Sequence, residues 1–264
     1  MRTFAIVLRQ FYLIRGSPSR IFPLFAWVAI DIVVWGFFTR YLNTLAEPGF
    51  SFVPALLGAV LLWDFFTRVM QGVTMAFLED VWARNFLNVF ATPLKIREYL
   101  AGLVISSIAT STFGLIVMLL VATLVFGLRV FGYGLVLIPF LLVLFLFGIA
   151  LGITGAAIVL RLGPASEWFI WPVPALISPF VGVFYPLSTL PVWMQWVAMA
   201  LPPAYVFENL RRVVAGTQPS LAALAGSIAL AGIDIALACW CFSVVYRYAV
   251  RTGLLARYSA ESVS

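Results

Sequence analysis

Six long apolar segments, separated by short polar stretches, set the pattern of this chain. A helix that crosses a membrane needs about 20 predominantly apolar residues, and each segment meets that length. Strict alternation of apolar and polar residues is absent from them, so the pattern predicts helices rather than strands. The six predicted spans cover residues 21–42, 52–78, 99–126, 135–160, 168–187 and 222–246. The predicted fold class is therefore an all-α integral membrane protein, with residues 1–264 forming one transmembrane domain.

The first 16 residues have a different, amphipathic pattern. Arg2 and Arg9 recur seven residues apart, as do Thr3 and Gln10, and apolar side chains fill most of the remaining positions. A helix with one basic face and one apolar face is typical of segments that lie in the headgroup region of a bilayer. Residues 2–16 are thus predicted to form an interfacial helix.

One connecting segment is unusually polar for this chain. The stretch "FLEDVWARNFLNVFATPLKIREYLAG", residues 77–102, carries six charged side chains between two apolar spans. Its polar residues repeat at helical spacing until a proline ends the pattern; they are Asp80, Arg84, Asn85, Asn88, Thr92 and Pro93. Trp82, Phe86 and Phe90 belong to the opposite, apolar face. The pattern predicts a helix over residues 80–92 that either docks another protein through its polar face or serves as a simple interfacial anchor.

The stretch between the fifth and sixth predicted spans is apolar but cannot cross a membrane. Prolines divide residues 188–215 into pieces of about ten residues, which is too short for a span. Such pieces are tolerated at membrane depth only where protein or water covers their backbone. We expect short external or re-entrant helices over residues 190–215 that narrow an exit. The residues assigned to this exit region are Trp193, Trp196, Pro202 and Pro203.

Three carboxylates fall near the centres of predicted spans: Asp31, Asp64 and Asp234. An ionisable group at that depth costs about 2.5–3.5 kcal/mol on insertion scales and usually faces the interior of a helix bundle. Arg68 follows Asp64 by one helical turn and can neutralise it. The residues therefore form structural pairs, line a translocation path, or couple transport to protons.

Small residues recur at four-residue intervals in the fourth predicted span, at Gly148, Gly152 and Ala156, with Gly155 beside them. Small side chains at this spacing let two helix backbones approach closely. The neighbouring helix belongs either to the same bundle or to a second copy of the chain.

Composition agrees with the hydropathy pattern and excludes several functions. The chain is 64% hydrophobic and 10% charged, whereas a soluble domain is about a quarter charged. It contains no histidine, which removes the commonest metal ligand and the usual general base. Cys239 and Cys241 are two residues apart on a predicted helix, so they point to different sides and do not pair. We therefore predict neither a metal site nor an enzyme active site.

The distribution of basic residues predicts the orientation. With the N-terminus inside, eleven of the 16 Lys and Arg residues are cytoplasmic, four are external, and Arg68 lies within a span. Cytoplasmic loops of membrane proteins carry an excess of Lys and Arg, so both termini are predicted to face the cytoplasm. The net charge of +6 then reflects topology, and no nucleic acid is expected as a partner.

Two stretches of the chain resemble the permease subunit of type-2 ATP-binding-cassette (ABC) exporters. The first is residues 77–102, quoted above, where the family has an acidic end to the second span, an amphipathic coupling helix and a proline-containing turn. The second is "SPFVGVFYPLSTLPVWMQWVAMALPPAYVFENLRRVVAG", residues 178–216, where the family has an aromatic-Leu-Pro turn, short apolar helices and an arginine-containing helix. This chain has Pro202 and Pro203 where the family commonly shows Asn-Pro. The order of predicted spans matches as well, so the resemblance covers the whole chain.

The resemblance implies a particular set of partners. The coupling helix would dock onto a separate ABC ATPase, present in two copies and binding ATP and Mg, and two copies of this permease would form a homodimer in a bacterial inner membrane among lipids. The chain contains no G-x-x-x-x-G-K-[ST] motif, so it binds no nucleotide cofactor itself. The implied function is ATP-driven outward movement of a hydrophobic or amphiphilic substrate: a lipid, a lipid-linked glycan or a drug-like molecule. The alternative from another class is a secondary transporter or channel that uses the intramembrane aspartates for ions or protons.

Overall fold

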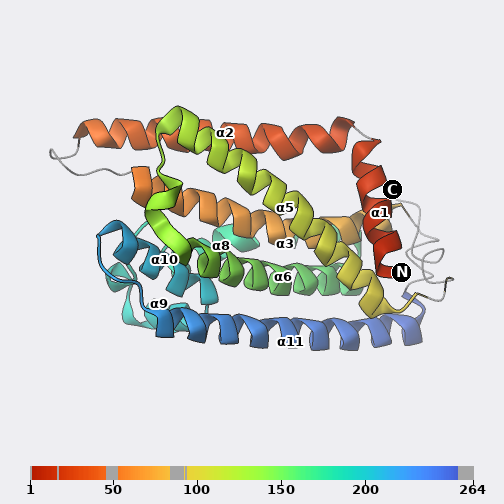
Figure 1. Cartoon of the computed structure of the whole chain (residues 1–264). Helices are drawn as coiled ribbons and strands as arrows, with labels where there is room; N and C mark the ends of the chain where they lie inside the picture. The colour runs from red at the N-terminus through yellow and green to blue at the C-terminus, as the bar shows by residue number, and fades with distance from the viewer. Residues whose placement is uncertain (1, 17, 46–52, 84–91, 93, 255–264) are drawn as a thin grey trace.

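The computed structural model describes residues 2–16, 18–45, 53–83, 92 and 94–254. Within this part of the chain every regular element is a helix (Figure 1). The five longest helices are α2 (Pro18–Leu45), α3 (Gly58–Trp82), α5 (Ile96–Phe126), α6 (Leu137–Leu162) and α11 (Leu221–Thr252). The shorter helices are α1 (Arg2–Arg15), η1 (Val53–Leu57), η2 (Val130–Val136), η3 (Pro164–Ser166), α7 (Glu167–Ile170), α8 (Val173–Val181), η4 (Leu187–Thr189), α9 (Val192–Met199) and α10 (Pro202–Val214).

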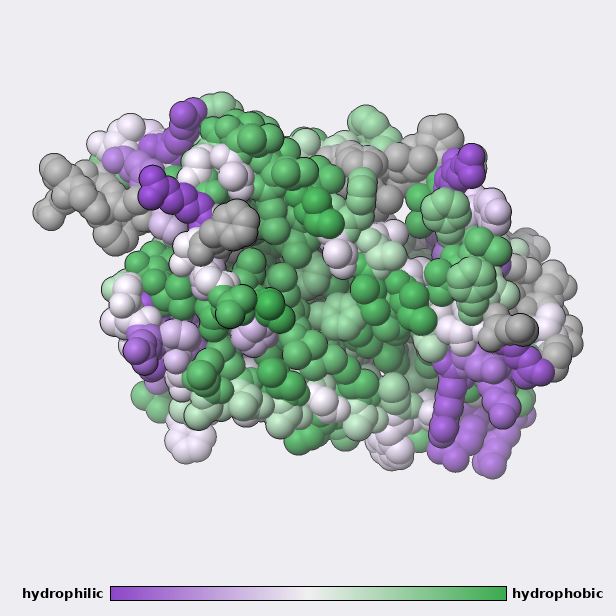
Figure 2. Space-filling view, in the orientation of Figure 1, coloured by the Kyte–Doolittle hydropathy of each residue, from purple (hydrophilic) through white to green (hydrophobic). Residues whose placement is uncertain are grey.

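Four stretches of helix in the described part are long and apolar enough to cross a membrane. They are Val53–Trp82, Ile96–Phe126, Gly132–Leu162 and Leu221–Thr252. Helices of 30 to 32 residues extend about 45–48 Å, which exceeds the hydrocarbon thickness of about 30 Å. A broad apolar band separates two polar ends of the molecule (Figure 2). The chain is therefore an integral membrane protein, and its second, third, fourth and sixth predicted spans match these helices.

The other two predicted spans behave differently. Helix α2 covers the first predicted span in 28 residues, although it is not one of the four helices above. The prediction of one continuous helix over residues 168–187 is wrong, because α7 stops at Ile170 and α8 runs only from Val173 to Val181. Pro172 and Pro174 explain the break, because proline lacks the N–H that donates a helical hydrogen bond. Gly182, with φ of 63°, then ends α8 in the left-handed conformation.

Helix α3 occupies the centre of the bundle and packs on α5 and α6. A Cβ added to Gly152 of α6 would lie 2.9 Å from the carbonyl oxygen of Met70, and one added to Gly148 would lie 2.9 Å from Cγ1 of Val69. The hydroxyl of Thr74 donates a hydrogen bond of 3.0 Å to the carbonyl oxygen of Gly152. The small residues of the fourth span thus serve packing within the bundle, which confirms the first of the two alternatives.

Helix α5 crosses the bundle diagonally and carries α2 on its outer side (Figure 1). Ser107 of α5 donates a hydrogen bond of 2.9 Å to the carbonyl oxygen of Val69 of α3. On the α2 side, Gly36 lies against the ring of Phe126, where a Cβ would come within 2.3 Å of a ring carbon. Helix α5 is therefore the main element on which α2 packs.

The two ends of the bundle are formed by different helices. Helix α1 lies across one end, where it packs on the start of α5 with Ile6 against Gly102 (Figure 1). The last turns of α6 and α11 meet at the same end, where the guanidinium of Arg161 sits 3.7 Å from the ring centre of Tyr248. We name this the α1 end, and name the opposite end, which holds α9 and α10, the α10 end (Figure 1).

Candidate functional site

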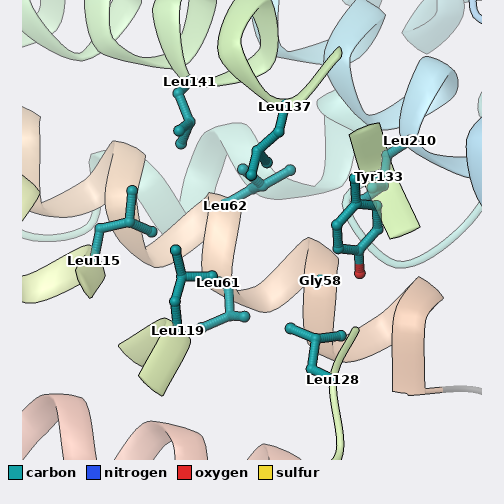
Figure 3. A pocket seen from close by; sticks show the side chains of 10 residues that line it. All are labelled: Gly58, Leu61, Leu62, Leu115, Leu119, Leu128, Tyr133, Leu137, Leu141 and Leu210. Carbon is teal, nitrogen blue, oxygen red and sulfur yellow. The ribbon is translucent and has the colours of Figure 1, made fainter. Parts of the chain in front are cut away.

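One apolar cavity inside the bundle is too small to be a binding site. It has a cavity volume of about 20 Å³ and is walled by apolar side chains of α3, α5 and α6, together with Tyr133 (Figure 3). The Tyr133 hydroxyl donates a hydrogen bond of 2.6 Å to the carbonyl oxygen of Pro54, which satisfies the polar group at its edge. This volume holds at most about one water molecule, so the space is a packing defect of the core.

A much larger groove lies between α2, α3 and α8. Its volume is about 490 Å³, within the range of about 300–1,000 Å³ that is typical of small-molecule sites. It is lined by Asp31, Trp35, Val60, Trp63, Asp64, Thr67, Gln71, Trp171, Pro174, Ala175, Ser178, Pro179 and Phe184. Two of the three predicted intramembrane acids are thus brought to one place by different helices.

The charges in this groove are arranged around α3. Arg68 donates hydrogen bonds from Nε and Nη2 to the two carboxylate oxygens of Asp64, and the longer of these is 3.3 Å. Both side chains are about 85% buried, being 15% and 14% exposed, so the pair predicted from their spacing is confirmed. Asp31 of α2 approaches the same pair and interacts with both Asp64 and Arg68. Two carboxyl groups therefore meet at one guanidinium, and the hydrogen bond between them requires one of the two to carry a proton.

Aromatic rings form the walls on either side of these charges. Trp35 stacks on Phe184 with ring centres 5.0 Å apart and an interplanar angle of 15°. Trp63 packs on Phe66 at 4.8 Å, and Trp171 is held by a hydrogen bond of 3.0 Å from its indole N–H to Glu167. The sequence analysis missed these rings. One signal for them exists, since Trp35 follows Asp31 by four residues and therefore shares its helix face.

Asp234 is not part of this groove. It lies on α11 and faces α6, beside a separate cavity of about 230 Å³ that Thr154 and Cys241 also line. Its Oδ2 atom is buried and has no hydrogen-bond partner within the described part of the chain. The three predicted intramembrane acids therefore belong to two places.

A second polar cluster closes the α1 end. Arg9 of α1 donates two hydrogen bonds to the carboxylate of Asp80, one of them 3.0 Å long from Nη1 to Oδ2. The Tyr99 hydroxyl at the start of α5 donates a third, of 2.6 Å, to Oδ2 of Asp80. The hydrogen bond with Asp80 is also the main reason why the pKa of Arg9 is raised above its ordinary value, so this guanidinium stays charged. Three segments that are far apart in sequence meet on one carboxylate.

This cluster corrects the position expected for Asp80. The helical pattern placed Asp80 on an exposed docking face, but its side chain is 2% exposed and belongs to the last turn of α3. The expected helix start at residue 80 is wrong for the same reason, because α3 continues to Trp82. Thr92 is exposed, as expected. Arg84, Asn85, Asn88 and Pro93 lie outside the described residues, so their docking role stays a prediction.

A comparison with known protein families decides what this architecture belongs to. The family model of the ABC-2 type transporter matches residues 1–214, which include the groove and the cluster at the α1 end. The chain belongs to the ABC-2 type transporter family. It is thus a permease of an ABC transporter rather than a nucleotide-binding domain, and families of this kind normally work with an ATPase subunit. A search of curated proteins finds no match.

The α10 end of this ABC-2 permease holds the residues assigned to the exit. Trp193 and Trp196 on α9 are 62% and 70% exposed, whereas Pro202 and Pro203 are buried in the first turn of α10. Proline is favoured there because its missing N–H would be unpaired in any case. The two tryptophans are therefore surface residues, whereas the two prolines begin α10 and are part of the core.

A clamp built on Arg211 and Glu208 fixes the turn after α8 to α10. Arg211 donates one hydrogen bond of 2.7 Å to the carbonyl oxygen of Gly182 and another of 2.8 Å to Glu208. Glu208 in turn accepts a hydrogen bond of 2.7 Å from the backbone N–H of Leu187. Because residues 182–187 lead away from the groove wall formed by α8, the clamp sets where that wall ends.

Proposed function

We propose that this permease is the membrane subunit of an ATP-driven exporter, and that its substrate passes through the groove between α2, α3 and α8. The observation that carries the proposal is the groove itself: about 490 Å³ of space with charged residues at its middle and aromatic walls, in a member of the ABC-2 family. Its size and its apolar lining suit a hydrophobic or amphiphilic molecule. The direction of transport is outward in this proposal.

The energy comes from a separate ABC ATPase, in two copies, which binds ATP and Mg. The segment over residues 84–92, which follows α3 in the chain, docks onto it. The cluster of Arg9, Asp80 and Tyr99 lies just before that segment and joins the end of α3 to α1 and α5. A push on the segment is therefore passed to three helices at once, which is how a local contact can become a movement of the bundle.

In the proposed topology the chain crosses the membrane six times, through α2, α3, α5, α6, the α7–α8 pair and α11. Helices α7 and α8 span 15 residues together with their turn, or about 22 Å of helix, which is shorter than the hydrocarbon layer. Helices α9 and α10 dip into the outer leaflet and complete this crossing. The excess of Lys and Arg then places the α1 end and both termini in the cytoplasm of a bacterial inner membrane.

Two copies of the permease face one another across the groove as a homodimer. Large apolar side chains that point outward from α2 and α8 support this arrangement, such as Val34 at 58%, Phe37 at 57% and Leu176 at 65% exposure. When ATP closes the two ATPase subunits, the permease copies rock and the path opens outward at their interface.

Co-elution of the ATPase with a tagged permease tests the proposal. The parent should retain the ATPase through size-exclusion chromatography, whereas Arg84→Glu should fold and insert normally but lose it. Arg129→Glu is the matched control, because it reverses an exposed charge on the loop between α5 and η2. A parent permease that retains no ABC ATPase contradicts the proposal. Normal retention by Arg84→Glu instead moves the docking surface to the loop from Arg161 to Glu167.

A further inference from the structure

We propose that the groove between α2, α3 and α8 selects uncharged amphiphiles: compounds with an extended aromatic or aliphatic body, few hydrogen-bonding groups and no net charge. The inference rests on the proposed function, because it names the substrate class of the same groove. Two properties of the groove lead to it. Its charged residues neutralise one another, and few of its other side chains can form hydrogen bonds.

The charged residues at the groove cancel without any ligand. Arg68 donates two hydrogen bonds to Asp64, which is one turn away on the same helix. Asp31 of α2 interacts with Arg68 and is hydrogen-bonded to Asp64. Ionised carboxylates only accept hydrogen bonds, so a hydrogen bond between two carboxyl groups requires one of them to be protonated. The set therefore consists of one neutral acid, one carboxylate and one guanidinium, and its net charge is zero.

A charged ligand would find no free counter-charge in this groove. Among the described residues that line it, the charged side chains are Asp31 and Asp64, and both are already engaged. An ionised group that enters a membrane region without a partner of opposite sign pays a large desolvation cost. Aromatic faces attract cations, but Trp35 and Phe184 are stacked, so each has one face occupied. An uncharged ligand keeps the contacts with the rings and avoids the desolvation cost.

The scarcity of hydrogen-bonding groups argues against a carbohydrate. Apart from the charged residues and the indole N–H groups, the polar side chains of the lining are Thr67, Gln71 and Ser178. Thr67 already donates its hydroxyl hydrogen to the carbonyl oxygen of Trp63 at 3.0 Å. A glycan would leave many hydroxyls without partners, each of which carries a desolvation penalty. Among the substrate classes that the sequence left open, an uncharged drug-like amphiphile fits best.

Three probes with one body and different charges test this directly. The 4-tert-butyl, 4-trimethylammonium and 4-sulfonate derivatives of diphenylhexatriene have tetrahedral end groups of similar size that are neutral, cationic and anionic. Their saturable binding to the purified full-length permease is measured as emission sensitised by tryptophan, with empty micelles of the same neutral detergent as background. We expect the neutral probe to bind at least about tenfold more tightly than either charged probe. A charged probe that binds as tightly as the neutral one overturns the proposal.

Substitutions then show whether the charged set causes the selectivity. The double variant Asp31→Asn with Asp64→Asn leaves the Arg68 guanidinium without a carboxylate, so binding of the sulfonate should rise by about tenfold or more. Asp234→Asn is the matched control, because Asp234 is an intramembrane aspartate outside the groove. If the double variant does not fold, Ser178→Arg places a permanent positive charge on the groove wall and should raise sulfonate binding in the same way. Sulfonate binding as weak as that of the parent in the folded variant overturns the inference.

Infrared spectroscopy tests the shared proton without any ligand. A protonated carboxyl group has a C=O stretching band that is separate from the bands of carboxylates and shifts in D2O. The difference spectrum between the parent and Asp31→Asn, in a detergent without carbonyl groups, should contain this band, because the substitution removes one carboxyl group and leaves Asp64 as the carboxylate partner of Arg68. A difference spectrum that shows only carboxylate bands overturns the inference.

These tests are independent of the ATPase, since they use the permease alone and no ATP. Preference for the neutral probe that changes in the double variant supports the inference even if no ABC ATPase co-elutes, in which case only the proposed function fails. A permease that retains its ATPase but binds the three probes equally loses the inference and keeps the proposed function.

Discussion

Arg9 and Asp80 are 71 residues apart in the chain, yet the guanidinium of the first holds both carboxylate oxygens of the second. Asp80 is 2% exposed and also accepts a hydrogen bond from the Tyr99 hydroxyl. This buried carboxylate therefore accepts three hydrogen bonds, two of them from a charged guanidinium. A buried carboxylate is tolerated only when its hydrogen-bonding capacity is filled in this way. The N-terminal helix is thus an integral part of the bundle's α1 end.

Removing one partner of this pair should destabilise the permease. Arg9→Gln leaves Asp80 buried with the Tyr99 hydroxyl as its remaining partner, which should cost about 2 kcal/mol because Arg9 is itself only partly buried. For a domain of this size that corresponds to a fall of about 5 °C in the apparent Tm in detergent. Adding Asp80→Asn should recover most of the loss, because the uncompensated charge is then gone.

Arg2 provides the control for this experiment. It sits on the same helix and pairs with Glu98 at 3.8 Å, with both side chains partly exposed, so Arg2→Gln should change the Tm by less than about 1 °C. The raised pKa of Arg9 also predicts how the stability of the permease depends on pH. A folded-state pKa above the unfolded value gives stability that is present below the unfolded pKa and lost as the pH rises through the folded one. Both pKa values of an arginine lie far above pH 9, so the contribution of Arg9 should not titrate away between pH 7 and pH 9. Equal Tm values for Arg2→Gln and Arg9→Gln would show that the Arg9 pair contributes no more than an exposed one.

Much of the bundle could be predicted from the sequence because apolar length is a strong signal in a membrane protein. The third predicted span, 99–126, corresponds to α5 at Ile96–Phe126, and the fourth, 135–160, to α6 at Leu137–Leu162. The fifth failed because mean hydropathy does not register Pro172 and Pro174, which break the helix without making it polar. Asp80 was misplaced because helical spacing reports only local neighbours, whereas its partner Arg9 lies 71 residues earlier in the chain.

The contact between α3 and α6 gives a second prediction about stability. Gly152→Ala places a methyl group 2.8 Å from Cβ of Val73 and 2.9 Å from the carbonyl oxygen of Met70, so the helices must separate or shift. Overpacking of this kind costs about 1–3 kcal/mol. The matched control is Gly232→Ala on α11, where the added Cβ meets nothing within 4 Å and the higher helix propensity of alanine makes the change neutral or stabilising. Thermal unfolding of the two variants in detergent checks this prediction, and a Gly152→Ala protein as stable as Gly232→Ala contradicts the close packing of α3 and α6.

Topology can be tested with single cysteines in a background without Cys239 and Cys241. Gln218 is exposed between α10 and α11 at the α10 end, and Thr252 is exposed at the last turn of α11. With the α1 end in the cytoplasm, a membrane-impermeant maleimide should label Gln218→Cys in intact cells and should label Thr252→Cys only after permeabilisation. The opposite pattern would invert the orientation, and labelling of both in intact cells would mean that α11 does not cross the membrane.

The groove shows what a single sequence can and cannot say about a site. Asp64 and Arg68 were recognisable because a charge pair stands out one turn apart in an apolar helix. Their association with Asp31 depends on how α5 holds α2, through Gly36 and Phe126, and no local pattern encodes that contact. The aromatic residues of the groove did not stand out in the sequence because they lie in stretches that are largely apolar.

The central claim is that ATP hydrolysis by a partner, rather than an ion gradient, drives transport through this permease. Everted membrane vesicles that contain the permease and its ABC ATPase test this most directly, with a panel of neutral amphiphiles as substrates. We predict accumulation that requires ATP, persists when an uncoupler abolishes the proton gradient, and disappears with a hydrolysis-deficient ATPase. Accumulation that an imposed ion gradient supports without ATP, and that the uncoupler abolishes, would contradict the claim and identify a secondary transporter.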